Sequence, residues 1–212
     1  GCEDILFGPK LSMMVVGRDA LREGRARDKL VRGAATDASV FDQYACSSPH
    51  TIFVERGGEL TPEQFAEQLA TEMEKALARI PKEAEDPAAV AQIKALRLRA
   101  ELVGRVWHSE DGAWTVIYDE ASDALAAPSY SRTITVKPVD DAFAVLENVS
   151  GDIQTIGLAM SGERRLDFAR QAALRGAERF PDVGRMTFFD SPWDGLFPME
   201  RLVKWVPLGG PV

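Results

Sequence analysis

One cysteine, Cys46, lies in a short stretch of small and turn-forming residues, 41–49 (FDQYACSSP). A helical pattern precedes this stretch and a strand pattern follows it. A thiolate attacks the carbonyl of a thioester readily, and it can leave again when a hydride reduces the acyl group to an aldehyde. Such a reaction needs backbone N–H groups directed at the developing oxyanion, and a turn through Ser47 and Ser48 can present them. The pattern predicts that Cys46 is a nucleophile that accepts an acyl group from a thioester.

Other interpretations of this stretch remain open from the residues alone. Most free cysteines are small buried apolar residues. His50 and His108 are the two histidines of the chain, and a Cys–His acyltransferase or thioesterase would require His50 beside Cys46. A third interpretation is a non-catalytic domain that serves subunit association. Two cysteines and two histidines at these spacings do not form a credible zinc site, so we expect no metal.

The composition fits one α/β domain of 212 residues with an ordinary apolar core. The net charge of −8 argues against nucleic acid or an anionic membrane as a partner. Two cysteines are too few for a disulfide framework, and no apolar run is long enough to span a bilayer, so we expect a reduced, cytoplasmic protein. The chain starts at Gly1 and enters a strand-like run almost directly, which suggests a piece of a larger protein.

Strand and helix patterns alternate over most of the chain. A capping box from Thr61 to Gln64, with a proline at the first helical position, begins the clearest helix, which ends near residue 80. Asp19 is expected to cap a helix over 20–35, whose Arg and Lys side chains form a solvated face. Further strands are predicted at 11–16, 51–55, 133–139, 153–160 and 185–189, further helices at 87–104 and 163–175, and a hairpin or edge pair over 106–118. This order predicts an α/β fold with a mostly parallel open sheet flanked by helices.

An ordered set of short motifs makes the chain similar to a known family. The motifs are FGPKLS at 7–12, DQ at 42–43, ACSSP at 45–49, RT at 132–133, IQTIG at 153–157, GRM at 184–186 and WDG at 193–195. Each motif alone is weak, but their order through nearly the whole chain resembles the acyl-CoA reductases of the LuxC family, which belong to the aldehyde dehydrogenase superfamily.

The resemblance implies a role for several residues. Residues 43–46 stand where aldehyde dehydrogenases carry Gly-Gln-x-Cys, so Cys46 matches their nucleophile, with Gln43, Ser47 and Ser48 near the substrate and the oxyanion. Leu6 stands where those enzymes carry the glutamate that activates water, and Gly8 would face the cofactor beside it. A leucine cannot act as a base, so hydrolysis of the acyl-enzyme is disfavoured.

The resemblance also implies the activity and its setting. It implies NADPH-dependent reduction of a long-chain fatty acyl-CoA, or another acyl thioester, to the aldehyde, as in bacterial bioluminescence. Residues 1–212 would be the catalytic domain, and the nucleotide-binding half would precede them. The chain alone is then not expected to turn over. Expected partners are synthetase and transferase subunits, and a homo-oligomer is left open.

Overall fold

The chain folds around one six-stranded sheet. The structure is a computed structural model, and it describes residues 8–22, 24–83, 87–102 and 104–210. The strand order is β3-β4-β5-β2-β1-β6, and all neighbouring strands are parallel except the antiparallel pair β3–β4 at one edge. The strands are β1 (Leu11–Val16), β2 (Pro49–Glu55), β3 (Arg105–His108), β4 (Thr115–Tyr118), β5 (Thr133–Val139) and β6 (Ile153–Ala159). The predicted fold class and the antiparallel edge pair are confirmed.

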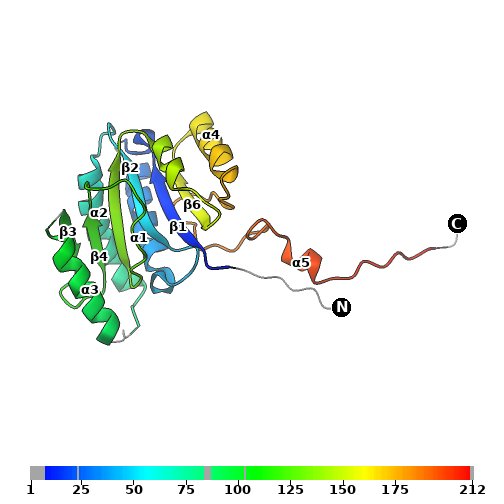
Figure 1. Cartoon of the computed structure of the whole chain (residues 1–212), viewed down its shortest axis with the longest axis horizontal. Helices are drawn as coiled ribbons and strands as arrows, with labels where there is room; N and C mark the ends of the chain where they lie inside the picture. Colours follow the sequence, from blue (N-terminus) through cyan, green and yellow to red (C-terminus); the bar gives the residue numbers. More distant parts are fainter. Residues whose placement is uncertain (1–7, 23, 84–86, 103, 211–212) are drawn as a thin grey trace.

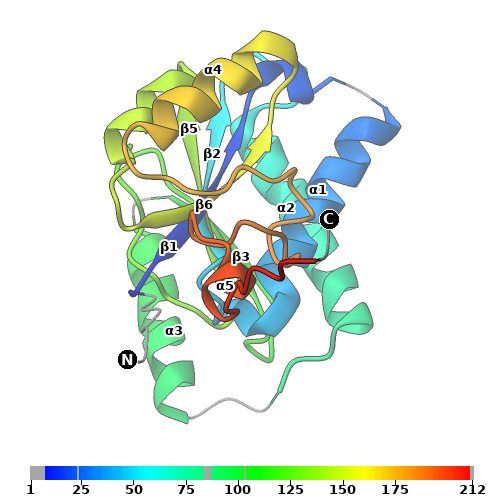
Figure 2. The ribbon, with the colours of Figure 1, turned by 90° about the vertical axis from the view of Figure 1, so that its right-hand side faces the viewer.

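Helices cover both faces of this sheet (Figures 1 and 2). The helices α1 (Arg25–Ser39) and α2 (Pro62–Arg79) pack on one face. The 3₁₀ helix η3 (Ala142–Asn148) and helix α4 (Gly162–Ala173) pack on the other. Helix α3 (Pro87–Ala100) contacts β3 and β4. The remaining elements are the 3₁₀ segments η1 (Arg18–Ala20) and η2 (Val40–Gln43) and the short α5 (Pro198–Arg201).

Strand β1 shows why the sheet has a core on each side. Met14 and Val16 belong to the cluster under α1 and α2, whereas Met13 and Val15 belong to the cluster under η3 and α4. All four side chains are fully buried. Alternation of side chains along a strand sends neighbours to opposite faces, so a central parallel strand must be apolar throughout.

Helix α2 begins where the sequence predicts. The Thr61 hydroxyl accepts a hydrogen bond from the Gln64 N–H at 3.2 Å, and the Gln64 amide oxygen accepts one from the Thr61 N–H at 2.9 Å. Two N–H groups that lack helical partners are thereby satisfied.

Two sequence-based expectations about the fold are wrong. Helix α1 begins at Arg25 rather than near residue 20, because the Asp19 carboxylate accepts hydrogen bonds from Ser161 and Arg164 instead of capping a helix. Residues 185–189 form turns rather than a strand. The N–H of Met186 donates to the Asp37 carboxylate of α1 at 3.2 Å, and this bond replaces a pairing with the sheet.

The carboxyl ends of the parallel strands meet a network of charges around one buried carboxylate. The Glu55 side chain, at the end of β2, is fully buried and pairs with Arg18 and Arg164, each at 2.8 Å. Burial raises the pKa of Glu55, but the hydrogen bonds from the two guanidinium groups outweigh it and hold the pKa at about 2. This network closes one end of the sheet.

Helix α5 and the chain that follows it extend away from the sheet (Figure 1). Several of its large apolar side chains are exposed, among them Met199, Leu202, Trp205, Val206 and Leu208. Among the described residues, no helix combines the length and the apolar character that crossing a membrane requires.

Candidate active site

Cys46 lies in the loop between η2 and β2, at the end of the sheet where the parallel strands begin. Its thiol is free and exposed. The Ser12 hydroxyl of β1 donates a hydrogen bond to the Cys46 carbonyl at 2.6 Å, and the Ser48 N–H donates to the Ala45 carbonyl at 2.9 Å. The main chain around the sulfur is therefore fixed to the sheet while the sulfur itself faces outward.

Gln43 attaches the cysteine loop to two strands at once. Its fully buried side-chain amide donates to the carbonyl oxygens of Pro49, at 2.7 Å, and Thr133, at 2.8 Å. Its amide oxygen accepts from the Thr133 N–H at 2.8 Å. Gln43 thus fixes the main chain of the loop that carries Cys46, and its expected place near the substrate stays a prediction.

A buried ion pair holds the same loop from the other side. Arg132, just before β5, has a side chain that is 1% exposed, and it donates to the Asp42 carboxylate at 2.6 Å. It also donates to the carbonyl oxygens of Ile80, at 2.8 Å, and Pro81, at 3.3 Å, after α2. One guanidinium therefore joins the cysteine loop to the end of a helix, and its planar fork suits this geometry.

The two segments joined by this ion pair share an unusual backbone conformation. Residues 41–43 have φ values of 55°, 50° and 68°, and residues 130–132 have values of 53°, 57° and 57°. None of the six is glycine. Side chains rarely adopt this left-handed region, and such residues gather at functional sites. We call the paired segments the left-handed clasp.

Ser47 and Ser48 lie directly after Cys46 and are both buried. Among the described residues, the hydroxyl of Ser48 has no hydrogen-bond partner. The described part of the chain also provides no acceptor for the N–H groups of Cys46 and Ser47. Two adjacent N–H groups beside an exposed sulfur are the donors that a tetrahedral oxyanion needs.

His50 lies inside β2 and is 6% exposed. Its ring contacts the edge of Tyr130, with the ring centres 5.1 Å apart, and within the described chain its Nδ1 atom has no partner. Burial lowers the pKa of His50 to about 4. A histidine with this pKa is neutral at pH 7 and a weak proton acceptor, which does not favour the Cys–His mechanism.

The buried His50 predicts a loss of stability in mild acid. Its pKa is about 4 in the folded chain and about 6.5 when unfolded, so the unfolded chain binds more protons between these values. The stabilising effect is complete above pH 6.5 and is lost as the pH falls toward 4, by about 3 kcal/mol. The difference in the free energy of unfolding between the parent and a variant without this imidazole, followed in urea from pH 7 to pH 4, isolates the effect, because Asp37, whose pKa is raised to about 7, stabilises the folded chain as the pH falls over the same range.

A phenylalanine variant tests the cause of this loss. His50→Phe removes the titrating group, so its free energy of unfolding should fall less than that of the parent as the pH drops below 6.5. His108→Gln, at the other histidine, should leave the dependence as in the parent. An unchanged slope in the phenylalanine variant would assign the acid lability to other groups.

Tyr130 also stacks on Tyr44, which precedes the nucleophile by two residues. The two rings are nearly parallel, with centres 5.2 Å apart, and both are substantially exposed. The stack therefore presents an apolar surface beside Cys46.

Arg179 is a residue of this site that the sequence did not reveal. It follows α4, is 9% exposed, and its guanidinium interacts electrostatically with Cys46. The Trp193 ring covers it at 4.1 Å, and the adjacent Asp194 accepts a hydrogen bond from Gln154 at the start of β6. The motifs around 154 and 194 thus meet near the nucleophile. No spacing or motif distinguishes Arg179 from the surface arginines of the chain.

The remaining motif, 184–186, packs between β6 and α1. A Cβ atom at Gly157 would lie 2.6 Å from the Met186 sulfur, so glycine is needed for this approach. The Asp37 carboxylate of α1 accepts from the Gly184 N–H at 2.6 Å, and burial raises the pKa of Asp37 to about 7. This contact fixes the C-terminal part of α1, which leads into the cysteine loop.

Two further residues named from the sequence lie before β1. Leu6 is outside the described residues. Gly8 is exposed, with open space where a side chain would be, and its expected place beside the cofactor stays a prediction.

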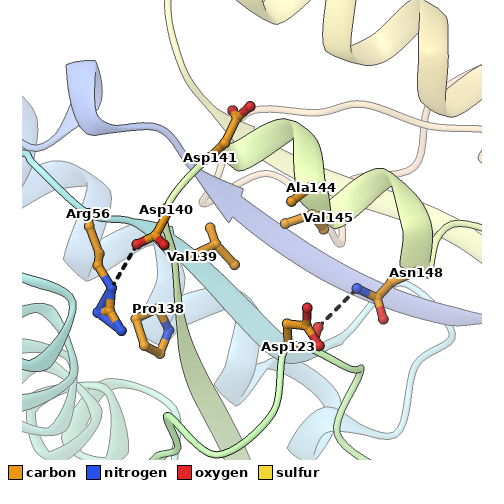
Figure 3. Close-up of a pocket in the computed structure, with 9 residues that line it drawn as sticks. All are labelled: Arg56, Asp123, Pro138, Val139, Asp140, Asp141, Ala144, Val145 and Asn148. Atoms are coloured by element: carbon orange, nitrogen blue, oxygen red, sulfur yellow. Dashed lines mark hydrogen bonds and ion pairs between the residues drawn. The ribbon is translucent and has the colours of Figure 1, made fainter.

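A pocket of about 300 Å³ lies at the other end of the sheet, by the carboxyl ends of β2 and β5 (Figure 3). Arg56, Asp140, Asp123 and Asn148 supply its polar groups, with Arg56 bound to Asp140 and Asn148 bound to the Asp123 carbonyl. It contains no nucleophile. Within the described ranges, no cluster of three or more His, Cys, Asp or Glu residues could hold a metal ion.

Comparisons with solved structures show a shared fold. The NAD-dependent aldehyde dehydrogenase of Burkholderia multivorans matches with a TM-score of 0.63 and 15% identity, over 82% of this chain and 35% of that one. A 1-pyrroline-5-carboxylate dehydrogenase from Thermus with bound NAD matches with a TM-score of 0.57 and 16% identity, over 82% of this chain and 36% of that one. The gamma-glutamyl-gamma-aminobutyraldehyde dehydrogenase of Burkholderia cenocepacia matches with a TM-score of 0.59 and 14% identity, over 82% of this chain and 38% of that one.

The chain therefore spans little more than a third of the length of these dehydrogenases. Among curated proteins, none matches its sequence. The model of the acyl-CoA reductase family LuxC matches residues 1–205. With the fold of the aldehyde dehydrogenases and this match over nearly its whole length, the chain belongs to the LuxC family of acyl-CoA reductases.

Proposed function

We propose that this chain is the catalytic half of an acyl-CoA reductase, and that Cys46 accepts the acyl group of a fatty acyl-CoA or another acyl thioester. The observation that carries the proposal is the contrast between the exposed Cys46 thiol and its fixed main chain. Ser12 and Gln43 hold the loop, and two N–H groups beside the sulfur have no acceptor among the described residues.

Acyl transfer follows from these groups. The Cys46 thiolate adds to the thioester carbonyl, so that an S–C bond forms and the carbonyl electrons move to oxygen. The N–H groups of Cys46 and Ser47 would donate to this oxyanion. Collapse of the adduct breaks the original C–S bond and releases the CoA thiolate. The acyl group is then linked to Cys46.

The site disfavours transfer of this acyl group to water. His50 is buried, neutral and hydrogen-bonded to none of the described residues at Nδ1. The acyl-enzyme would therefore persist until a hydride or a thiol reaches it. When bound, a nicotinamide cofactor would supply that hydride; the resemblance to the family suggests NADPH.

The residues present do not form a nicotinamide dinucleotide site by themselves. The sequence has no G-x-G-x-x-G. At the carboxyl edge, where parallel sheets bind nucleotide phosphates, the segment after β1 is engaged with the buried Glu55 carboxylate through Arg18. We infer that the nucleotide-binding half of the longer protein holds the cofactor.

The test is the intact mass of the chain after incubation with a long-chain acyl-CoA. We expect one acyl group to be added, and hydroxylamine to remove it because it cleaves thioesters. Cys46→Ser should gain no hydroxylamine-sensitive adduct, whereas Cys2→Ser should behave as the parent does. An adduct that persists in the Cys46→Ser variant would refute the assignment.

The longer protein extends the test. If the isolated chain forms no adduct, the same experiment on the protein with its nucleotide-binding half decides between a nucleophile that needs this half and a domain without catalysis. Absence of an adduct there would refute the proposed function.

A further inference from the structure

The guanidinium of Arg179 is a buried cation with neutral partners. It donates to the Thr155 hydroxyl at 3.1 Å and to the carbonyl oxygens of Met186, at 3.3 Å, and Phe188, at 2.8 Å. Trp193 covers one face. Among the described residues, no carboxylate forms an ion pair with it. These neutral hydrogen-bond partners do not neutralise the positive charge of the guanidinium.

The sheet places this cation beside the nucleophile. Thr155 on β6 lies directly opposite Ser12 on β1, and the two side chains share one face of the sheet. Thr155 accepts from Arg179, and Ser12 donates to the Cys46 carbonyl at 2.6 Å. The guanidinium and the cysteine loop thus each bind the hydroxyl of one of two paired residues in neighbouring strands.

The electrostatic balance at Arg179 agrees with this placement. Burial lowers its pKa, and three negative groups act against burial: Asp194, the Cys46 sulfur and Asp190. The two carboxylates belong to the loop that Trp193 anchors, and Asp194 is itself held by Gln154.

We propose that Arg179 is a positioning residue whose positive charge attracts negatively charged groups toward the reacting sulfur of Cys46. The role of Arg179 in the reaction rests on the proposed function. There, the guanidinium would stabilise the negative charge of the departing CoA thiolate. Its carbonyl bonds and the Trp193 ring keep it in place, so little reorganisation is needed during the reaction.

Two alkylating reagents of similar size and different charge test the proposal. Iodoacetate is an anion and iodoacetamide is neutral. In both reactions the Cys46 sulfur forms an S–C bond and iodide leaves. We expect the ratio of the iodoacetate rate to the iodoacetamide rate, measured on the Cys46 peptide by mass spectrometry, to exceed the ratio for N-acetylcysteine. Salt should reduce this preference.

Variants identify the responsible cation. Arg179→Met should lower the ratio about tenfold, which corresponds to about 1.4 kcal/mol, and Arg179→Lys should restore part of it. Arg185→Met is the matched control, because Arg185 lies in the same segment and also covers an aromatic ring, that of Phe188. It should leave the ratio unchanged. Circular dichroism verifies that each variant folds.

Two outcomes would overturn the proposal. One is a parent ratio equal to that of N-acetylcysteine, which requires no variant and holds even if Arg179→Met fails to fold. The other is an unchanged ratio in a folded Arg179→Met chain. Failure of the proposed function is a separate result, because it appears as absence of an acyl adduct while the alkylation ratio still reports on Arg179.

Discussion

Replacement of Arg132 by methionine should lower the free energy of unfolding by about 3–5 kcal/mol. The side chain is 1% exposed and joins Asp42 to the carbonyl oxygens of Ile80 and Pro81. Methionine fills a similar volume but leaves a carboxylate and two carbonyl groups without their donor. Removal of one partner from a buried ion pair costs this much because the other charge stays buried.

The measurement is urea unfolding of the parent and of Arg132→Met. Arg56→Met is the matched control: Arg56 also pairs with acidic side chains, Glu120 and Asp140, but its side chain is 41% exposed. An exposed pair contributes about 1 kcal/mol or less. A loss below about 1 kcal/mol in Arg132→Met would show that the clasp does not depend on this pair.

A double-mutant cycle then separates the pair from its surroundings. Asp42→Asn, Arg132→Met and the double variant should couple strongly, because each single change leaves the other group unpaired in a buried site. Arg132→Lys should rescue only part of the loss, since an ammonium group cannot reproduce the planar fork that reaches three oxygens.

Replacement of Gln43 by leucine should cost about 3 kcal/mol of stability. Three hydrogen bonds to main-chain groups of Pro49 and Thr133 are lost, and each buried group left unsatisfied costs about 1–3 kcal/mol. Because these bonds hold the loop of Cys46, acylation of Cys46 should also slow by about tenfold or more. Urea unfolding and the rate of adduct formation measure the two effects.

Two companion variants test whether the amide itself matters. Gln43→Glu keeps an acceptor for the Thr133 N–H but offers no donor to the two carbonyl oxygens, so it should also be destabilised. Gln64→Ala removes another amide that binds a main-chain N–H, in the exposed capping box of α2, and should cost only about 1 kcal/mol. Equal costs for Gln43→Leu and Gln64→Ala would contradict the role given to burial.

Local signals in the sequence predicted much of the fold. The bounds of β1 and β5 were predicted without error, because each is a β-branched or apolar run bounded by polar or turn-forming residues. The start of α2 followed from its capping box. In each case the residues that decide the structure are neighbours in the sequence.

The errors in the sequence-based predictions arise where residues far apart in the sequence determine the local structure. Asp19 has the residue type of a helix cap, but Arg164, 145 positions later, engages its carboxylate. Arg132 and Asp42 are 90 positions apart, so their pairing was invisible although both lie in motifs. Arg179 is one of 25 lysines and arginines, and only the packing of the segment after β6 shows that it is buried near Cys46.

The backbone conformation of the left-handed clasp also lowers the conformational stability of the chain. Residues 41–43 and 130–132 are held in a backbone region that costs a non-glycine residue on the order of 1 kcal/mol or more. Glycine adopts these backbone angles without that cost, but at Gln43 and Arg132 it would also remove the side-chain hydrogen bonds that hold the loop. The chain therefore accepts a strained backbone at six positions, and the side chains at these positions restrict the motion of the loop that carries Cys46.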